Sequence, residues 1–159
     1  PLDTYVEFTG AGTMRFADFV NGGVTRDVLE RIVVKKHDYR ASFQCLRNSA
    51  TDFSTLNACA ALWDGQWHLA VGARPKKAKF LEGEDLGLPA RFSPEELDAA
   101  CQRARDLNYG TDRRASAAYR AELAEVLSRR AILEAAAQQD VATEIRLAAE
   151  AAKPKGVSA

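Results

Sequence analysis

The sequence lacks the features that would point most directly to several classes of function. It has no net charge, with 22 Lys and Arg against 22 Asp and Glu, whereas a protein that binds nucleic acid through its phosphates needs a basic surface or stripe. No run of about 18 apolar residues is present, so we expect no transmembrane span. No basic segment followed by an apolar run opens the chain, and we expect no secretory signal. Nucleic-acid binding and membrane insertion are therefore not predicted.

Cysteine and histidine are too few and too scattered to build a metal site. Cys45, Cys59 and Cys101 form no CxxC pair, and the only histidines are His37 and His68. Zinc and iron–sulfur sites need closely spaced ligands of these types, so we interpret each cysteine as a small buried apolar residue. Cysteines in this odd, scattered arrangement favour a reducing, cytoplasmic location. Neither histidine suggests a catalytic triad, and we interpret His37 as a surface residue and His68 as a satisfied residue within a sheet.

Glycine-rich nucleotide-binding loops are also missing. Gly10-Ala11-Gly12 and Gly22-Gly23 match neither GxGxxG nor the P-loop pattern. The acidic turn from Glu82 to Gly87 has too few regularly spaced oxygen ligands for a calcium loop. The residues alone therefore predict no self-sufficient catalytic centre.

The central part of the chain has the pattern of an antiparallel meander. Tyr39–Arg47 alternates in hydrophobicity, Phe53–Trp63 is a longer apolar run, and Trp67–Val71 is the returning strand. Asp64-Gly65 lies between the last two runs and is a strong hairpin signal. Small residues over Asn57–Ala61 would let a neighbouring layer approach closely. We therefore predict a three-stranded sheet.

Helical patterns follow these strands. Ser93 is placed to be an N-cap with Glu96 completing a capping box, and Gly110 is expected to end this helix. A short helical turn is expected over Lys77–Leu81, and a longer helix over 116–138. Its predicted apolar stripe consists of Tyr119, Leu123, Val126 and Leu127, with Arg120 and Arg130 outside it. A last helix would be capped by Asp140. This order predicts an α+β fold, with about three helices on one face of the sheet.

The first part of the chain is expected to be a lead-in to this domain. Residues 1–37 have a mixed pattern, with a turn signal at Asn21-Gly22-Gly23 and a strand over Val28–Val34. We therefore divide the chain into a lead-in (1–37), a domain (38–139) and a C-terminal helix and tail (140–159). Because the chain starts at Pro1 and its only methionine is Met14, we expect a processed product or a piece of a longer protein.

The most specific pattern lies at the start of the long helix. Thr111–Arg120, continuing through Leu127–Ala131, resembles the D-x-R-A-S-x-x-Y-R…vL-x-R-R-A signature that closes the FAD subunit of the xanthine dehydrogenase and aerobic carbon monoxide dehydrogenase family. Leu69–Pro75 is similar to the a-x-G-(A/G)-x-P turn of that family. Arg47–Ser54 resembles its Arg-rich strand end and the following D-(F/I/Y)-(A/S) start.

Two upstream segments extend the resemblance. Phe16–Val20 and Val28–Ile32 are similar to the linker that leaves the flavin-binding domain of these enzymes. The resemblance thus runs in the right order from about Met14 to Ile132. It implies the fold of the CO dehydrogenase flavoprotein C-terminal domain for residues 38–139, and it makes residues 1–37 the end of an FAD-binding domain.

The resemblance also implies a function. The chain would be part of the FAD subunit of a molybdenum hydroxylase, would complete the flavin site and the subunit contacts, and would not be catalytic alone. FAD would be shared with an N-terminal FAD-binding domain, while the molybdenum cofactor and the 2Fe–2S clusters would lie on a molybdopterin subunit and an iron–sulfur subunit. Electrons would pass from these centres to the flavin and then to an acceptor such as NAD. A homodimer of the complex is a further expectation. Purines, carbon monoxide, N-heterocycles and aromatic thioesters all stay open as substrates.

Four residues fall on flavin-site positions of the family. Leu29 matches a leucine that lines the flavin, and Gln44 stands where those enzymes place a lysine after an aromatic residue. Arg47 lies near a basic position and Asp52 on an acidic one. A glutamine supplies a neutral amide in place of the point charge of a lysine.

Several residues of the resemblance have a simpler alternative. Leu29 is also suited to an ordinary core, Arg47 to an ion pair with Asp52 across a turn, and Tyr119 and Arg130 to joining the long helix to the sheet or to a partner subunit. At the level of function, the missing FAD loops and the glutamine at the lysine position suggest an alternative: a non-catalytic interaction module that kept the fold but does not bind flavin.

Overall fold

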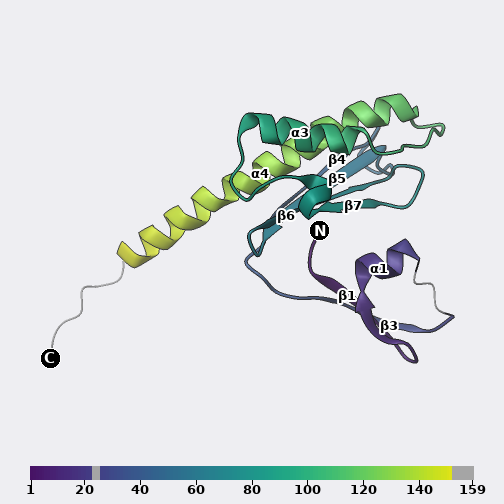
Figure 1. The fold of residues 1–159 in the computed structure, drawn as a ribbon, viewed down its shortest axis with the longest axis horizontal. Helices are drawn as coiled ribbons and strands as arrows, with labels where there is room; N and C mark the ends of the chain where they lie inside the picture. Colours follow the sequence, from purple (N-terminus) through teal and green to yellow (C-terminus); the bar gives the residue numbers. More distant parts are fainter. Residues whose placement is uncertain (23–25, 152–159) are drawn as a thin grey trace.

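The structure is a computed structural model, which describes residues 1–22 and 26–151 of the chain, with side chains up to Gln138. Two antiparallel sheets follow each other along the chain (Figure 1). The N-terminal sheet has the strand order β2-β1-β3, and the larger sheet has the order β4-β5-β6-β7. The strands are β1 (Thr4–Phe8), β2 (Gly12–Arg15), β3 (Leu29–Val34), β4 (Arg40–Leu46), β5 (Leu56–Trp63), β6 (Gln66–Gly72) and β7 (Lys79–Glu82). The helices are α1 (Phe16–Asn21), α2 (Gly83–Leu86), α3 (Pro94–Arg105) and α4 (Ala117–Ala151).

The lead-in is more regular than its sequence pattern predicts. β3 confirms the strand expected over 28–34, and β1, β2 and α1 form where we expected only a mixed segment. Val6 and Phe8 alternate toward one face of this sheet and are buried. The ring of Phe19 in α1 packs 5.4 Å from the ring of Phe8, so α1 closes that face. The turn predicted at Asn21-Gly22-Gly23 lies partly outside the described residues.

The larger sheet contains the three predicted strands and one more. The predicted hairpin is confirmed at Asp64 and Gly65, whose φ angles of 53° and 73° are those that a type I′ turn requires. The helical turn predicted over 77–81 is wrong, because β7 pairs there with β6. Leu81 faces the core and Phe80 faces the other side of the sheet. Side chains that alternate between the two faces are typical of a strand, and this segment forms one because β6 offers an edge for pairing. The helical turn α2 follows β7.

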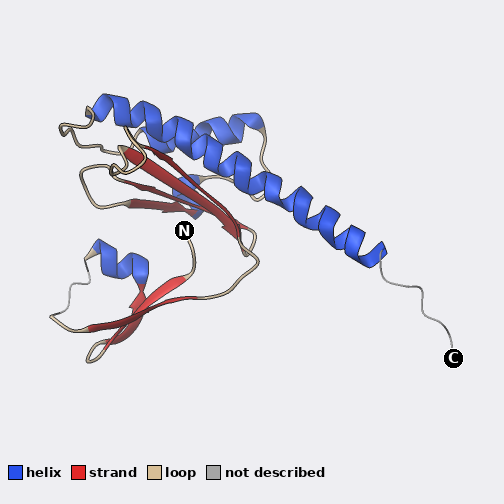
Figure 2. Ribbon diagram, turned by 180° about the vertical axis from the view of Figure 1, so that it is seen from behind, coloured by secondary structure: helices blue, strands red, loops and turns tan. Residues whose placement is uncertain are grey.

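The helices cover one face of the larger sheet (Figure 2). The capping box of α3 is confirmed, with Ser93 and Glu96 bonding each other's backbone N–H. α3 ends at Arg105 and not near Gly110 as predicted, since the N–H of Gly110 donates to the carbonyl of Arg74, 3.0 Å away. α4 continues through Asp140, so the separate last helix is wrong. Residues 136–151 contain no glycine or proline to break it.

The side of α4 that faces the sheet differs from the predicted stripe. Tyr119 and Val126 are 49% and 42% exposed, whereas Leu127 is buried as expected. The buried side chains of α4 are Arg120, Ala124, Leu127, Ser128, Ala131, Ile132 and Ala135. Most of them are small, and they face a strand that is itself lined with alanine, so helix and sheet approach closely. No helix in the described part of the chain has the length and hydrophobicity needed to cross a membrane.

The helices α2, α3 and α4 leave the other face of the larger sheet uncovered, and α1 and the first residues of the chain lie across a pocket of about 140 Å³ from Trp63, Ala70 and Phe80 on that face (Figures 1 and 2). We call this side of the sheet the open face. Register and burial place on it two rows of paired residues, Phe43–Cys59–Ala70–Phe80 and Ala41–Ala61–His68–Glu82. Phe43 on the edge strand β4 is 55% exposed. At the opposite side of this face the chain's first residues lie close, and the indole N–H of Trp63 donates to the carbonyl of Pro1, 2.9 Å away. The β4 side of the open face is thus the part available for another surface.

Candidate functional site

Three segments that stand out in the sequence meet at one end of the larger sheet. They surround a shallow pocket of about 370 Å³. Its lining residues come from the β4–β5 loop and the start of β5, from the β6–β7 loop and from the α3–α4 loop: Phe53, Ser54, Asn57, Ala73, Pro75, Asp112 and Arg114. Asn57 also belongs to the open face, because it lies two residues before Cys59 on β5 and alternate residues of a strand share a face. The pocket is therefore continuous with the uncovered side of the sheet.

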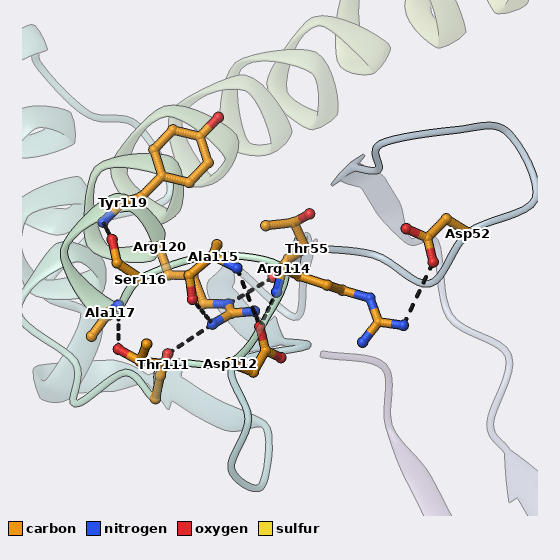
Figure 3. Close-up of polar contacts among 11 residues, drawn as sticks. Asp52, Thr55, Thr111, Asp112, Arg114, Ala115, Ser116, Ala117, Tyr119 and Arg120 are labelled. Atoms are coloured by element: carbon orange, nitrogen blue, oxygen red, sulfur yellow. Dashed lines mark hydrogen bonds and ion pairs between the residues drawn. The ribbon is translucent and has the colours of Figure 1, made fainter.

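A buried arginine ties two of these segments together. Arg120 in the first turn of α4 is only 1% exposed. Its Nε donates to the carbonyl of Thr55 at 3.0 Å, and its Nη1 donates to the carbonyls of Gly110 at 2.8 Å and Ala115 at 2.7 Å. Its Nη2 donates to Asp112 Oδ1 at 2.6 Å (Figure 3). One guanidinium thus fixes the entry to β5 and the loop before α4. Sequence reasoning placed Arg120 outside the apolar stripe and missed this role, although it is the last residue of the D-x-R-A-S-x-x-Y-R signature.

Asp112 is the anionic partner of this arginine. Its Oδ1 also accepts the backbone N–H of Arg114 at 2.8 Å and that of Ala115 at 3.2 Å. The hydrogen bond from Arg120, followed by the two backbone hydrogen bonds, lowers the pKa of Asp112 to about 2. The carboxylate is therefore ionised at neutral pH, and it holds the turn that presents Arg114.

These bonds predict a pH dependence of stability. In the unfolded chain Asp112 has its ordinary pKa, near 3.8, so the native state binds its proton less readily than the unfolded state. The stability that Asp112 contributes is present above about pH 4 and is lost as the pH falls from about 4 toward 2. We expect Asp112→Asn to remove this part of the acid sensitivity. Urea unfolding of both proteins between pH 5 and 2 measures it, and a flat difference between the two profiles would contradict the assignment.

The start of α4 accounts for two more positions of the signature. The hydroxyl of Ser116 accepts the backbone N–H of Tyr119 at 3.2 Å, and the hydroxyl of Thr111 accepts that of Ala117 at 2.9 Å. Both satisfy N–H groups that a helix start leaves free. The Tyr119 side chain points away from the Arg120 cluster (Figure 3), and Arg130 is exposed. Arg120, and not Tyr119 or Arg130, therefore joins the start of α4 to the sheet. A contact of Tyr119 and Arg130 with a partner subunit stays a prediction.

Arg114 reaches across the pocket to the β4–β5 loop. Its Nη2 lies 3.6 Å from Asp52 Oδ1, and its guanidinium lies 5.4 Å from the ring centre of Phe53. Phe53 is 79% exposed. Arg47 in the same loop donates to the carbonyl of Ala50 at 3.4 Å. The ion pair expected between Arg47 and Asp52 does not form. Asp52 pairs with Arg114 instead.

The other predicted site residues lie farther from the pocket. Leu29 begins β3 in the N-terminal sheet and is 42% exposed. Gln44 points to the helix side of β4, where its Nε2 donates to Glu134 on α4 and, at 3.3 Å, to the hydroxyl of Ser42. The fold thus brings Asp52 next to the lining residue Arg114 and Arg47 to the same loop as Asp52, and does not bring Leu29 or Gln44 to the pocket. Their contact with a flavin stays a prediction.

The histidines and cysteines form no centre of their own. His37 is exposed as expected and lies 3.1 Å from Asp3. His68 is 3% exposed and stacks between Trp63 and Phe80, with ring centres 4.5 and 5.8 Å away. It was expected to be satisfied, yet neither ring nitrogen makes a hydrogen bond in the described part of the chain, although Nδ1 lies 3.2 Å from Glu82. Burial lowers the pKa of His68.

The cysteines differ in their burial. Cys101 is fully buried, as expected, and burial raises the pKa of its thiol to about 11. Cys45 and Cys59 are only half-buried, which departs from the expectation. Among the residues that the structure describes, no cluster of histidine, cysteine and acidic residues could hold a metal ion.

Comparison with known proteins gives one family. The family model of the CO dehydrogenase flavoprotein C-terminal domain matches residues 41–135. No curated protein sequence matches the chain. The fold is similar to that of quinoline 2-oxidoreductase from Pseudomonas putida 86, with a TM-score of 0.70, 20% identity, and coverage of 86% of this chain and 53% of that one.

Two carbon monoxide dehydrogenases share the fold. The enzyme from Hydrogenophaga pseudoflava that lacks the Mo-pyranopterin moiety gives a TM-score of 0.70 at 20% identity, with coverage of 86% and 53%. The reconstituted enzyme from Oligotropha carboxidovorans gives 0.63 at 21%, with coverage of 86% and 54%. The chain spans about half the length of these chains.

Proposed function

The chain belongs to the CO dehydrogenase flavoprotein C-terminal domain family, and from this premise we propose that it is the C-terminal part of the FAD-binding subunit of a molybdenum hydroxylase. In this role it completes the flavin site and the subunit contacts and has no catalytic centre of its own. The observation that carries the proposal is the pocket at the end of the sheet. Three segments separated in sequence surround it, two of them tied together by Arg120 and the third bonded through the carbonyl of Arg74 to the N–H of Gly110, and an uncovered sheet face adjoins it.

The open face and the pocket fit a flat aromatic ring better than they fit a phosphate. On the β4 side the rows of the open face contain the small residues Ala41 and Cys59, which leave room for a planar group, and Phe43 and Phe53 are exposed. In contrast, the N–H groups of Gly10 and Ala11 both donate to Asp27 Oδ2, so this glycine turn offers them to no phosphate. We therefore propose that this chain contacts the isoalloxazine ring, and that another domain holds the diphosphate.

In this arrangement FAD supplies the group that accepts and releases electrons. The residues of this chain would orient it and exclude water. Phe53 would lie against the ring, Arg47 and Asp52 would set the charge on the β4–β5 loop, and Leu29 would reach the ring from the N-terminal sheet. Gln44 would not touch the ring, and it would support β4 through its hydrogen bonds to Glu134 and Ser42.

The remaining parts of the machinery are proposed partners. We propose an FAD-binding domain upstream, whose last part is formed by residues 1–37, an iron–sulfur subunit with 2Fe–2S clusters, and a subunit that carries the molybdenum cofactor. Residues 38–139 would form the domain itself, and residues 140–159 an extension of α4. α4 spans 35 residues, about 50 Å, and runs past the sheet (Figure 1), where a partner subunit can reach it.

The absorbance spectrum and mass of the natively purified protein, recovered with the chains that accompany it, test the proposal. We expect a flavin spectrum together with iron and molybdenum on companion subunits, and loss of the flavin when the upstream FAD-binding domain is removed. A colourless protein whose native terminus lies near Pro1 and which has no flavoprotein partner would refute it. The non-catalytic interaction module would then be the better account.

A further inference from the structure

The β4–β5 loop, residues 47–54, is held mostly by contacts within itself. The N–H of Thr55 donates to the carbonyl of Leu46 at 2.7 Å and closes the base of the loop. The N–H of Asp52 donates to the carbonyl of Ser49 at 3.2 Å, and Asp52 Oδ1 accepts the N–H of Phe53 at 2.7 Å. These bonds shape the loop, but they do not fix its tip against the rest of the protein.

Arg114 makes the described side-chain contacts that link this tip to the protein body. Its guanidinium reaches both Asp52 and Phe53. Its own backbone is fixed by Asp112, which Arg120 holds. Arg120 also holds the base of the loop through the carbonyl of Thr55. The same buried arginine therefore sets both the base of the loop and the anchor of its tip.

We propose that Arg114 is a positioning residue, which holds the 47–54 loop over the pocket through Asp52 and Phe53. The inference rests on the proposed function in one respect, namely that a flavin lies beside this loop. Arg114 Nε is buried and makes no hydrogen bond among the described residues, so the side chain is placed by its contacts to the loop and by its backbone. Among the described residues, the ring of Phe53 stacks on the guanidinium of Arg114. Without Arg114 this exposed ring would be free to move with the loop.

Hydrogen exchange of the full chain, followed by mass spectrometry, tests the positioning role directly. We expect Arg114→Gln to raise the exchange rate of the 47–54 loop roughly threefold to tenfold, the combined effect of a partly exposed ion pair and a cation–π contact. Asp52→Asn should raise it less, and the double variant no more than Arg114→Gln alone. Arg114→Lys should restore part of the protection, because it keeps the charge but not the planar group.

The neighbouring residue gives a matched control. Arg113 is exposed and precedes Arg114 directly, so Arg113→Gln makes the same chemical change without touching the loop. It should leave loop exchange at the wild-type rate, and the Asp64–Gly65 hairpin should be unchanged in every variant. Wild-type loop exchange in both Arg114→Gln and Asp52→Asn would overturn the proposal. Equal acceleration by Arg113→Gln and Arg114→Gln would also overturn it, since net charge would then be the cause.

A second readout separates this inference from the proposed function. In the complete flavoprotein, quenching of the flavin fluorescence by acrylamide reports how well the loop covers the ring. We expect the quenching constant to rise roughly threefold in Arg114→Gln and not in Arg113→Gln, in proportion to the loosening of the loop. Faster loop exchange with unchanged quenching would support the role of Arg114 and refute the flavin position beside this loop. Unchanged loop exchange would refute the role of Arg114 itself.

Discussion

Replacing Arg120 by methionine is expected to lower the free energy of unfolding by about 3 kcal/mol. The substitution keeps most of the buried volume but removes a guanidinium that is 1% exposed. The carbonyls of Thr55, Gly110 and Ala115 then lose their donor, and buried acceptors without partners cost stability. Asp112 loses its cation as well, although its carboxylate is 31% exposed and can take up water. The loss should appear as a lower urea midpoint in equilibrium unfolding followed by circular dichroism.

Two further variants make this result interpretable. Arg130→Met introduces the same change at an exposed position of the same helix and should leave the unfolding free energy within about 0.5 kcal/mol of wild type. Arg120→Lys keeps a charge but lacks the planar fork, so we expect an intermediate loss and a folded protein even if the methionine variant does not fold. Equal stability of Arg120→Met and Arg130→Met would contradict the role of Arg120 as the tie between these segments.

Features decided within a few residues could be predicted from the sequence. The Asp64-Gly65 turn needs positive φ angles that these residue types tolerate, and it forms as expected. The capping box at Ser93 and Glu96 depends on four consecutive residues, and it forms as well. Both signals contain their own hydrogen-bond donors and acceptors, so distant contacts do not change the outcome.

Features decided by distant contacts could not be predicted. β7 forms because β6 offers an edge, so Lys79–Glu82 became a strand where a helical turn was expected. The buried side of α4 is set by a sheet lined with alanine, which favours small residues and left Tyr119 exposed. In both segments the local sequence pattern is compatible with two arrangements, and contacts with distant residues determine which one forms.

The candidate site shows the same division. The signature at 111–120 was found in the sequence, but its last residue was interpreted as lying outside the apolar face of the helix. Nothing in the spacing of charges indicates that Arg120 would be buried, because its partners include three backbone carbonyls from segments up to 65 residues away. Carbonyls are present at every position of a chain and leave no trace in a sequence pattern. The cluster therefore becomes visible only in the fold.

A charge on the open face is expected to separate folding from flavin binding. Phe43 lies on the edge strand β4 and is 55% exposed. Lysine is well tolerated on an edge strand, so Phe43→Lys should change the unfolding free energy of the chain by no more than about 1 kcal/mol. In the complete flavoprotein, however, this position would face the flavin-binding domain or the ring itself. A lysine there must be desolvated against an apolar surface, and we expect the affinity for FAD to fall about 100-fold, as for the loss of a central contact residue.

The helix side of the domain provides the control for this experiment. Val126 on α4 is 42% exposed and lies across the sheet from the open face, so Val126→Lys adds the same charge to the same fold. FAD titration followed by flavin fluorescence should give a wild-type dissociation constant for Val126→Lys and a raised one for Phe43→Lys. Equal affinity in the two variants would show that the open face does not meet the flavin-binding domain. A lower affinity for FAD in Val126→Lys alone would show that the flavin-binding domain contacts the helices and not the open face. An added charge is costly only on a surface that becomes buried in the assembly.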